Sequence, residues 1–248
     1  MKNILLVAAL GLFFNNAYAA DDSWTGFYLG GNAGYSKSNA DSTVALGGLW
    51  SGESQQLQDF TFSNSNQNQN PKGASYGFQA GYDYQFENKF VLGFEVDYSE
   101  LNLEESRQSG PLVAPLGFPV TFAFSNKVEV DHTFSVRPKF GIAIHKTLVY
   151  ITGGYAWVSA DFSSDLFGTN GYSKVGKTSK TIGSAIFGAG IEHKFFDNVS
   201  AKLEYLKTNT EDTSYTTVDR NTNFPGYTET FKVDLDYSVI RVGINYRF

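Results

Sequence analysis

The last nine residues of the chain alternate strictly between apolar and polar side chains. The polar positions are Arg241, Gly243, Asn245 and Arg247, and the apolar positions are Ile240, Val242, Ile244, Tyr246 and Phe248. A period of two predicts a β-strand with one apolar and one polar face. At the edge of a soluble sheet such a strand favours aggregation, whereas in a closed barrel its apolar face can meet lipid. The pattern therefore predicts a transmembrane β-barrel.

The same period recurs along the chain. It covers residues 26–37, 75–86, 90–103, 130–144, 148–162, 180–196, 199–208 and 231–248. About ten residues suffice for a tilted strand to cross a bilayer. Short turns at 87–89, 145–147 and 197–198 alternate with long polar stretches at 38–74, 104–129, 163–179 and 209–230. This asymmetry is typical of outer-membrane barrels, whose short turns are periplasmic. We predict an all-β fold: an eight-stranded antiparallel up-and-down transmembrane barrel with four long extracellular loops and periplasmic termini.

Two positions depart from the regular pattern. Pro138 lacks a backbone N–H in the fourth segment, and we expect a bulge or an unpaired carbonyl there. In the eighth segment the apolar parity changes near Ser238 and Val239. Either a bulge or a strand that rises above the membrane would explain this change.

The amino-terminal residues have the features of an export signal. Lys2 precedes an apolar run at residues 4–14, and Ala17-Tyr18-Ala19 forms an A-x-A cleavage site. The apolar run is too short to span a bilayer, which needs about 20 residues. We expect residues 1–19 to be a signal peptide that is cleaved after Ala19, and residues 20–248 to form the barrel domain in the outer membrane.

Composition excludes several classes of function. The chain has no Cys, so it contains no disulfide framework or cysteine nucleophile. Its formal net charge of −6 argues against nucleic acid as a partner. The chain has three histidines. Their positions predict neither a Ser/His/Asp catalytic triad nor a metal site.

The polar face of the predicted strands is rich in glycine and in charge. Glycine weakens a strand unless groups must approach closely, and the interior of an eight-stranded barrel is just wide enough for side chains to fill. Eight charged residues fall on this inward parity: Glu95, Asp97, Arg137, Lys139, Glu192, Lys202, Glu204 and Arg241. Paired carboxylates could suggest acid–base catalysis, but buried charges must in any case be paired. We expect a charge cluster that fills the lumen, no catalytic residue and no enzyme.

Several segments resemble a known family. Residues 24–35 (WTGFYLGGNAGY), 135–141 (SVRPKFG), 148–156 (LVYITGGYA), 188–192 (GAGIE) and 203–205 (LEY) are similar to strands of alphaproteobacterial outer-membrane surface-antigen barrels. The resemblance implies an OmpA-like barrel at the surface of a Gram-negative bacterium. Some relatives bind haemin and others are known chiefly as structural antigens. The closing residues Ile244, Tyr246 and Phe248 resemble the insertion signal read by the barrel-assembly machinery.

The main interpretation is a monomeric structural surface antigen without a cofactor, whose loops serve surface interaction or adhesion. Its partners would be outer-membrane lipid and lipopolysaccharide, the assembly machinery, and host surface molecules or haemin. Alternatives are a haemin-binding protein, a small porin and an exported soluble lipocalin-like barrel. The candidate haem ligands are His132, Tyr172, Tyr215 and Tyr227.

Three loop features are open to a functional or a structural interpretation. Residues 171–178 fit G-x-x-x-x-G-K-T, but the helix that a P-loop needs does not follow. Lys174, Lys177 and Lys180 form a basic cluster that could meet phosphates or propionates or could simply be solvated. Residues 111–119 are apolar for an exposed loop, which suggests either a partner contact or packing over the barrel mouth.

Overall fold

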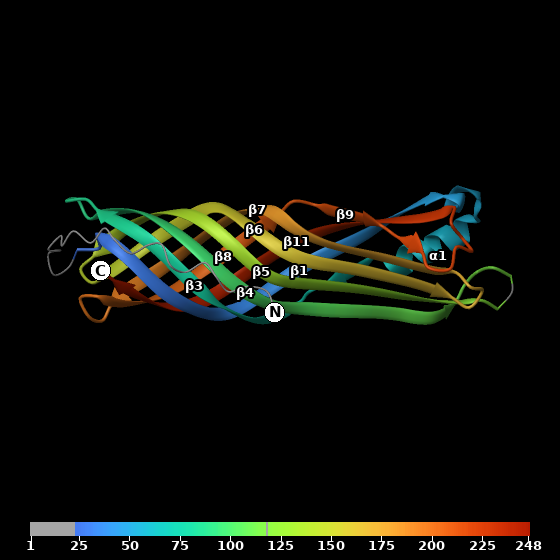
Figure 1. Ribbon diagram of the computed structural model, residues 1–248, viewed down its shortest axis with the longest axis horizontal. Helices are drawn as coiled ribbons and strands as arrows, with labels where there is room; N and C mark the ends of the chain where they lie inside the picture. The colour runs from blue at the N-terminus through green and yellow to red at the C-terminus, as the bar shows by residue number, and fades with distance from the viewer. Residues whose placement is uncertain (1–22, 118) are drawn as a thin grey trace.

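The computed structural model describes residues 23–117 and 119–248 as one elongated β-barrel. Figure 1 shows the C-terminus at one end of the barrel and the helix α1 at the opposite end. The predicted signal peptide and its cleavage residues Ala17 and Ala19 lie outside the described residues. Within those residues, no helix has both the length and the apolar character needed to cross a membrane.

Eight long strands form the wall. They are β1 (Gly26–Gly48), β3 (Lys72–Gln85), β4 (Phe90–Val113), β5 (Thr121–Ile144), β6 (Thr147–Gly168), β7 (Ser173–Lys194), β8 (Val199–Thr210) and β11 (Tyr227–Arg247). Each pairs antiparallel with the next, and β11 pairs with β1 to close the ring. The shorter elements are β2 (Gln67–Gln69), β9 (Thr213–Thr216), β10 (Val218–Asp219), the 3-10 helix η1 (Leu49–Gly52) and α1 (Gln55–Ser65). The predicted eight-stranded antiparallel barrel is confirmed.

The strands extend well beyond their predicted ends, so the predicted loop boundaries were wrong. Strands β4 and β5 each have 24 residues, and much of the polar sequence assigned to loops continues the ladder. The remaining connections at the α1 end are residues 49–71, 114–120, 169–172 and 211–226. The first contains η1, α1 and β2, and the last contains β9 and β10.

The barrel has two halves with opposite arrangements of polar and apolar side chains. In β11 the odd-numbered residues face inward along the whole strand. They are polar near the C-terminus, as at Arg241 and Asn245, and apolar farther up, as at Val233 and Leu235. The strand has no bulge near Ser238, so that expectation was wrong, and the alternative of a strand rising above the membrane fits. The outward face meets lipid below and water above, and the composition of each face changes accordingly.

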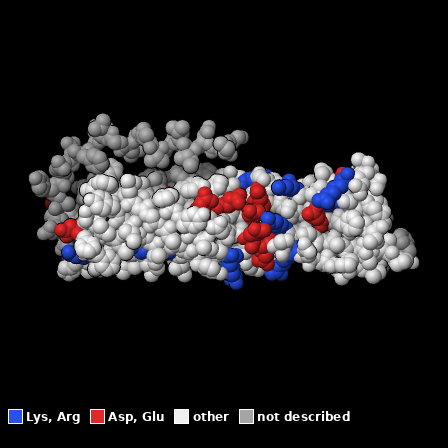
Figure 2. Space-filling model, turned by 60° about the horizontal axis from the view of Figure 1, so that its bottom comes forward, with Lys and Arg blue, Asp and Glu red and all other residues white. Residues whose placement is uncertain are grey.

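Two aromatic girdles bound the lower half on its outer surface. The girdle near the short turns includes Phe27, Tyr82, Tyr84, Phe86, Phe90, Tyr246 and Phe248, all more than a third exposed. The second girdle lies nearer the loops and consists of Tyr35, Tyr76, Tyr98, Tyr155, Trp157 and Tyr205. Interfacial aromatic girdles flank the apolar band of membrane barrels. Figure 2 shows charged side chains gathered over the half toward the loops, with few on the other half except at its extreme end.

The wall is irregular near Asp131 rather than at Pro138. A register shift separates Val130 from His132 in the β5–β6 ladder. At Pro138 the register is unchanged, so the expected bulge is absent, but the β5–β6 ladder is interrupted. The carbonyl of Pro138 accepts a hydrogen bond of 2.8 Å from the Thr152 hydroxyl. This side-chain donor replaces a backbone ladder bond, which proline disrupts.

Candidate functional site

The eight charged residues predicted for the lumen all lie inside the lower half of the barrel. Each is at most 4% exposed. Arg137 lies at the centre, with its guanidinium 2.6 Å from Glu95, 3.2 Å from Asp97 and 3.4 Å from Glu204. The structure therefore brings together groups from β4, β5 and β8 that the sequence could only place on one face.

Two further bases complete the pairing of these carboxylates. Lys202 lies 2.8 Å from Glu95, and Arg241 lies 2.6 Å from Glu204 and also pairs with Asp97. Because each carboxylate contacts more than one cation, the ion pairs offset the desolvation cost of burying these charges.

A second group of charges lies nearer the short turns. Lys139 is 2.9 Å from Asp83 and 3.9 Å from Glu192, and Arg247 is 2.8 Å from Asp83. The sequence analysis did not include Asp83 and Arg247 in the cluster. Both fall on the inward parity, so the alternation alone could have found them. With them the ion-pair network contains five acidic and five basic side chains.

Tyrosines and glycines fill the space between these charges. The Tyr28 hydroxyl donates to Glu95 at 2.7 Å, and that of Tyr150 donates to Glu204 at 2.9 Å. A Cβ at Gly190 would lie 2.5 Å from the Tyr150 ring, and one at Gly81 would collide with Tyr28. Glycine is therefore required where each ring crosses the lumen. The interior of this half is occupied by side chains that bind one another.

The upper half has an apolar interior instead. Its core includes Leu103, Val130, Phe162, Leu235 and other aliphatic and aromatic residues of the surrounding strands. Above it, Phe60 of α1 packs against Phe122 and Phe124 of β5 with ring centroids 6.4 and 6.0 Å apart. The first connection thus folds over the barrel mouth and covers the core. We call η1, α1 and the aromatic residues around them the extracellular cap.

Glu229 joins several segments of the cap. Its side chain is completely buried and accepts a 2.6 Å hydrogen bond from the Trp50 indole. It also accepts hydrogen bonds from the hydroxyls of Tyr172 and Thr217. These donors come from three different connections, so one carboxyl group ties them to β11.

We expect Glu229→Ala to loosen the cap without unfolding the membrane half. Three buried donors would lose their acceptor, and an unsatisfied buried donor costs about 1–3 kcal/mol. The first connection should then become sensitive to added protease on intact cells, while heat-modifiable migration of the barrel is kept. Glu53→Ala is the control, because the Glu53 side chain accepts a hydrogen bond from the Tyr227 hydroxyl at the part-buried rim. Equal protease resistance of Glu229→Ala and the unmodified protein would contradict this role.

The architecture and the sequence now agree on one family. A family model described as "Outer membrane protein beta-barrel domain" matches residues 5–248. The chain belongs to this outer-membrane β-barrel family. It is 27% identical to a 31 kDa outer-membrane immunogenic protein of Brucella melitensis, over 100% of both chains. It is 25% identical to a 25 kDa outer-membrane immunogenic protein of Brucella canis, over 100% of this chain and 99% of the relative.

Among solved structures, the outer-membrane protease OmpT of Escherichia coli is similar at 10% identity with a TM-score of 0.47. The comparison covers 92% of this chain and 100% of OmpT.

The four candidate haem ligands do not form one ligand set. His132 lies on the outer face, stacked on Tyr98 with ring centroids 5.5 Å apart, whereas Tyr172 and Tyr227 lie in the cap. Burial, with the nearby Glu229, raises the pKa of Tyr172 well above its usual value. The hydrogen bond to Glu53 raises the pKa of Tyr227 to about 12, and burial raises that of Tyr215 to about 12. The protonated phenols are poor iron ligands at neutral pH, and haemin binding stays a prediction.

Most of the sequence that fits a P-loop, residues 173–178, belongs to strand β7. Lys174 is 2% exposed and donates to the carbonyls of Phe224 and Tyr227 at 2.6 and 2.7 Å. The phosphate-binding lysine of the motif would be Lys177, but β7 continues to Lys194, so a strand follows the motif in place of the helix that a P-loop needs. The basic cluster is also not formed, since Lys174 faces inward while Lys177 and Lys180 are exposed.

The apolar segment 111–119 shows features of both interpretations, packing over the barrel mouth and exposure to a partner. Ala114 is 3% exposed and Leu116 packs against the cap core. Val113, by contrast, is 69% exposed. The connection packs over the mouth, and Val113, the last residue of β4, leaves an apolar side chain in contact with solvent.

The described residues contain no group of three or more acidic or histidine side chains able to hold a metal ion. The assembly-signal residues Ile244, Tyr246 and Phe248 are 64%, 48% and 56% exposed on the outer wall. Their role in insertion stays a prediction.

Carboxylates gather on the outer face of β4, β5 and β6 just above the upper girdle. Glu129 is the cross-strand neighbour of both Glu104 and Asp161. Lys127 lies 2.8 Å from Glu104 and 2.9 Å from Glu129 and partly offsets their repulsion. Partial burial, with Asp161 and Glu129 nearby, raises the pKa of Asp131. We call the four carboxylates Glu104, Glu129, Asp131 and Asp161 the acidic strip.

We expect Asp131→Asn to stabilise the barrel modestly at neutral pH. A raised pKa means that the folded protein disfavours the ionised form, so stability falls as the pH rises through that pKa. The gain, about 0.2–1 kcal/mol, should disappear below about pH 4. It can be measured by urea unfolding in detergent micelles at both pH values. Asp197→Asn in a short turn, with Lys146 3.9 Å away, is the control. A gain that persists at low pH would contradict charge repulsion as the cause.

Proposed function

We propose that this outer-membrane barrel is a structural surface antigen without enzymatic activity. Its upper half acts as a rigid stalk that holds the cap and the strand tips away from the membrane, where they contact molecules outside the cell. Two relatives from Brucella carry the description "outer-membrane immunogenic protein", which fits display at the cell surface.

The observation that carries this proposal is the length of the upper half. Strands of 24 residues extend about 80 Å at ~3.3 Å per residue, whereas about ten residues cross the bilayer. Above the upper girdle the outer face is polar and the interior apolar, as in a soluble barrel. More than half of each of these two strands therefore stands in water, far more than an anchor requires.

Exposed apolar side chains at the far end support a role in contact. Leu49, Val113, Phe167 and Val218 are 59%, 69%, 56% and 64% exposed. Such side chains on an outward end favour association with a protein or other ligand at the cell surface.

The filled lumen supports a structural function over transport or catalysis. The ion-pair network crosses the lower half, the apolar core occupies the upper half, and the cap covers the mouth. Carboxylates such as Glu95 and Glu204 are held by arginine and lysine with no room for a substrate. In planar bilayers we expect the purified protein to give no stable large channels. Such channels would instead favour the small-porin alternative.

Surface display can be tested directly because the chain has no Cys. Single substitutions Val113→Cys and Val218→Cys should react on intact cells with a membrane-impermeant maleimide. Asn88→Cys, in a short turn, should react only after the outer membrane is permeabilised. Reaction of Asn88→Cys on intact cells, or protection of both tip positions, would overturn the proposed orientation.

A further inference from the structure

Three lysines lie along one cross-strand row on the outer wall. Lys207 of β8 is the cross-strand neighbour of Ser238 in β11, Ser238 is that of Lys37 in β1, and Lys37 is that of Lys72 in β3. All three lysines are exposed. We call Lys37, Lys72 and Lys207 the lysine row.

The lysine row lies directly above the upper aromatic girdle. Tyr35 is two residues below Lys37 on the same face of β1, and Tyr205 is two residues below Lys207 on β8. They are 57% and 47% exposed. Interfacial aromatic rings mark the level of lipid headgroups. The ammonium groups are therefore placed where the phosphates of outer-leaflet lipids lie.

The pairing of Lys37 with Lys72 is unfavourable without an anion. Side chains directly opposite on one face have Cβ atoms about 4.5–5.5 Å apart, and like charges there are destabilising. Within the described part of the chain neither lysine forms an ion pair, while Lys207 lies 3.9 Å from Asp236. Elsewhere on the outer surface, Lys127 is paired with Glu104 and Glu129, and Lys232 with Asp212. The lysine row has two positive charges with no protein partner.

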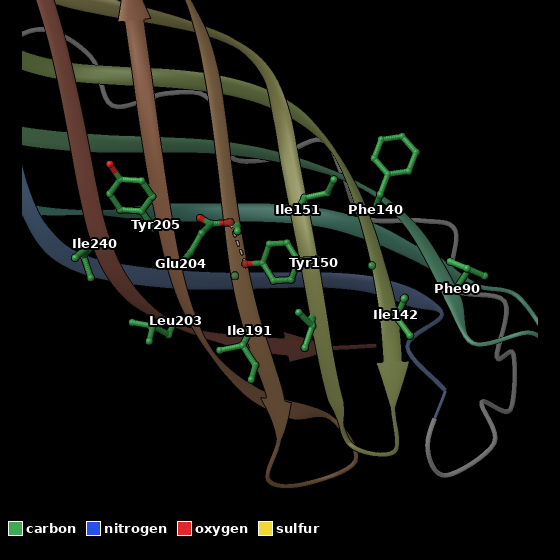
Figure 3. Close-up of a pocket in the computed structure, with 14 residues that line it drawn as sticks. Phe90, Phe140, Ile142, Tyr150, Ile151, Ile191, Leu203, Glu204, Tyr205 and Ile240 are labelled. Atoms are coloured by element: carbon green, nitrogen blue, oxygen red, sulfur yellow. Dashed lines mark hydrogen bonds between the residues drawn. The ribbon is translucent and has the colours of Figure 1, made fainter.

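An apolar hollow of about 690 Å³ lies on the outer wall, mainly over β5, β6, β7 and β8, and its rim includes Tyr205 and Ile240. Its lining includes Gly141, Ala189 and Gly190, which have no side chain or a single methyl group. Figure 3 shows Ile240 and Tyr205 at one side of the hollow and Phe90 and Phe140 at the other. Ile240 and Tyr205 are two residues below Ser238 and Lys207 in their strands. The rim of the hollow thus lies just below the Lys207 end of the lysine row, with Lys37 and Lys72 on the next strands.

We propose that the lysine row and the hollow together bind a phosphorylated lipid of the outer leaflet. Lys37 and Lys72 contact its phosphate groups, and an acyl chain enters the hollow at the rim below Lys207. A soluble anion would not use the apolar hollow, and a neutral lipid would not relieve the lysine repulsion. The acidic strip on β4, β5 and β6 repels phosphate, which favours a headgroup position at the lysine row. This inference rests on membrane location and does not depend on what the cap and tips contact.

Native mass spectrometry of the protein in nonionic detergent micelles, titrated with lipid A, tests the proposal. Lipid A carries phosphates and several acyl chains, and saturable binding is expected. Lys37→Gln/Lys72→Gln should weaken binding by about tenfold to thirtyfold, whereas Lys37→Arg/Lys72→Arg should retain it. Lys127→Gln/Lys232→Gln is the matched control, because it removes the same charge from paired lysines and should leave binding unchanged. Heat-modifiable migration of every variant shows that the barrel is folded.

The hollow has its own variant. Ala189→Phe fills it and should weaken the binding of lipid A while the lysine row stays intact. Inorganic phosphate at the concentration of the lipid should not displace it. Full displacement by phosphate would mean an anion site only and would overturn the proposal. An equal loss in the control variant, or unchanged binding in both the glutamine and the phenylalanine variants, would also overturn it.

Discussion

Arg137→Ala should destabilise the barrel by about 3 kcal/mol, among the largest effects of a single substitution in this chain. Arg137 is completely buried and contacts Glu95, Asp97 and Glu204. Removing one partner of a buried ion pair costs about 3–5 kcal/mol because the remaining charge is uncompensated. We expect the lower end of this range, since Lys202 and Arg241 still contact the same carboxylates. The measurement is the free energy of unfolding by urea in detergent micelles.

Arg107→Ala is the matched control for this experiment. Arg107 lies 2.8 Å from Glu105, but its side chain is 49% exposed. An exposed ion pair contributes at most about 1 kcal/mol, so this substitution should change stability little. If the two variants lost equal stability, the lumen would be hydrated and its charges would not form the interior of the barrel.

Ile151→Arg should destabilise the membrane-inserted barrel by about 2–4 kcal/mol. Ile151 is 64% exposed on the outer wall, in β6 between the two aromatic girdles. An arginine on the lipid face near the middle of the bilayer has this cost because its charge enters hydrocarbon. The free energy of unfolding in lipid vesicles is the measurement, and the level of folded protein in the outer membrane should also fall.

Val218→Arg is the matched control, because it places arginine at an equally exposed position that meets water instead of lipid. Val218 is also 64% exposed, but it lies in β10 at the cap end of the barrel. Arginine there is solvated, so stability should remain within about 0.5 kcal/mol of the unmodified protein. Equal losses at the two positions would contradict the assignment of the lower half to the membrane. An unchanged Ile151→Arg variant in vesicles would do the same.

Together these experiments separate the two environments that define the molecule. The lower half has a polar interior and an apolar exterior, and the upper half has the reverse. A barrel that continues in this way beyond the bilayer supports presentation of the cap, which is the function proposed here. The filled lumen and the outer wall then have distinct roles, the first in stability and the second in contact with lipid.

The sequence by itself determined the class of fold and the inward face of the lower half. The period of two in residues such as 240–248 depends only on the geometry of a strand, so it could be read without the structure. The same parity correctly placed Glu95, Arg137, Glu204 and Arg241 in the lumen. It would also have placed Asp83 and Arg247 there. Glycine on the polar face indicated a narrow, filled interior, as the close approach of Tyr150 to Gly190 confirms.

The extent of the strands could not be read in the same way. Residues 163–166 continue the alternation of β6, with buried Ser164 and Leu166 and less buried Ser163 and Asp165, but their polar composition predicts a loop. Serine, asparagine and aspartate have low strand propensity, and only pairing with neighbouring strands overrides it. The apolar side chains of β11 change parity because the strand keeps its geometry while it passes from lipid into water.

Only the tertiary structure decided which side chains meet. The partners of Arg137 lie on β4 and β8, and the pairing depends on how the closed barrel staggers its strands, which no local pattern records. Glu229 collects Trp50, Tyr172 and Thr217 from connections far apart in the chain. Lys174 looked like a solvated loop lysine and is instead buried against two carbonyls. Periodicity is a local property of the backbone and specifies faces, whereas contacts across a lumen or a cap arise only when the barrel closes.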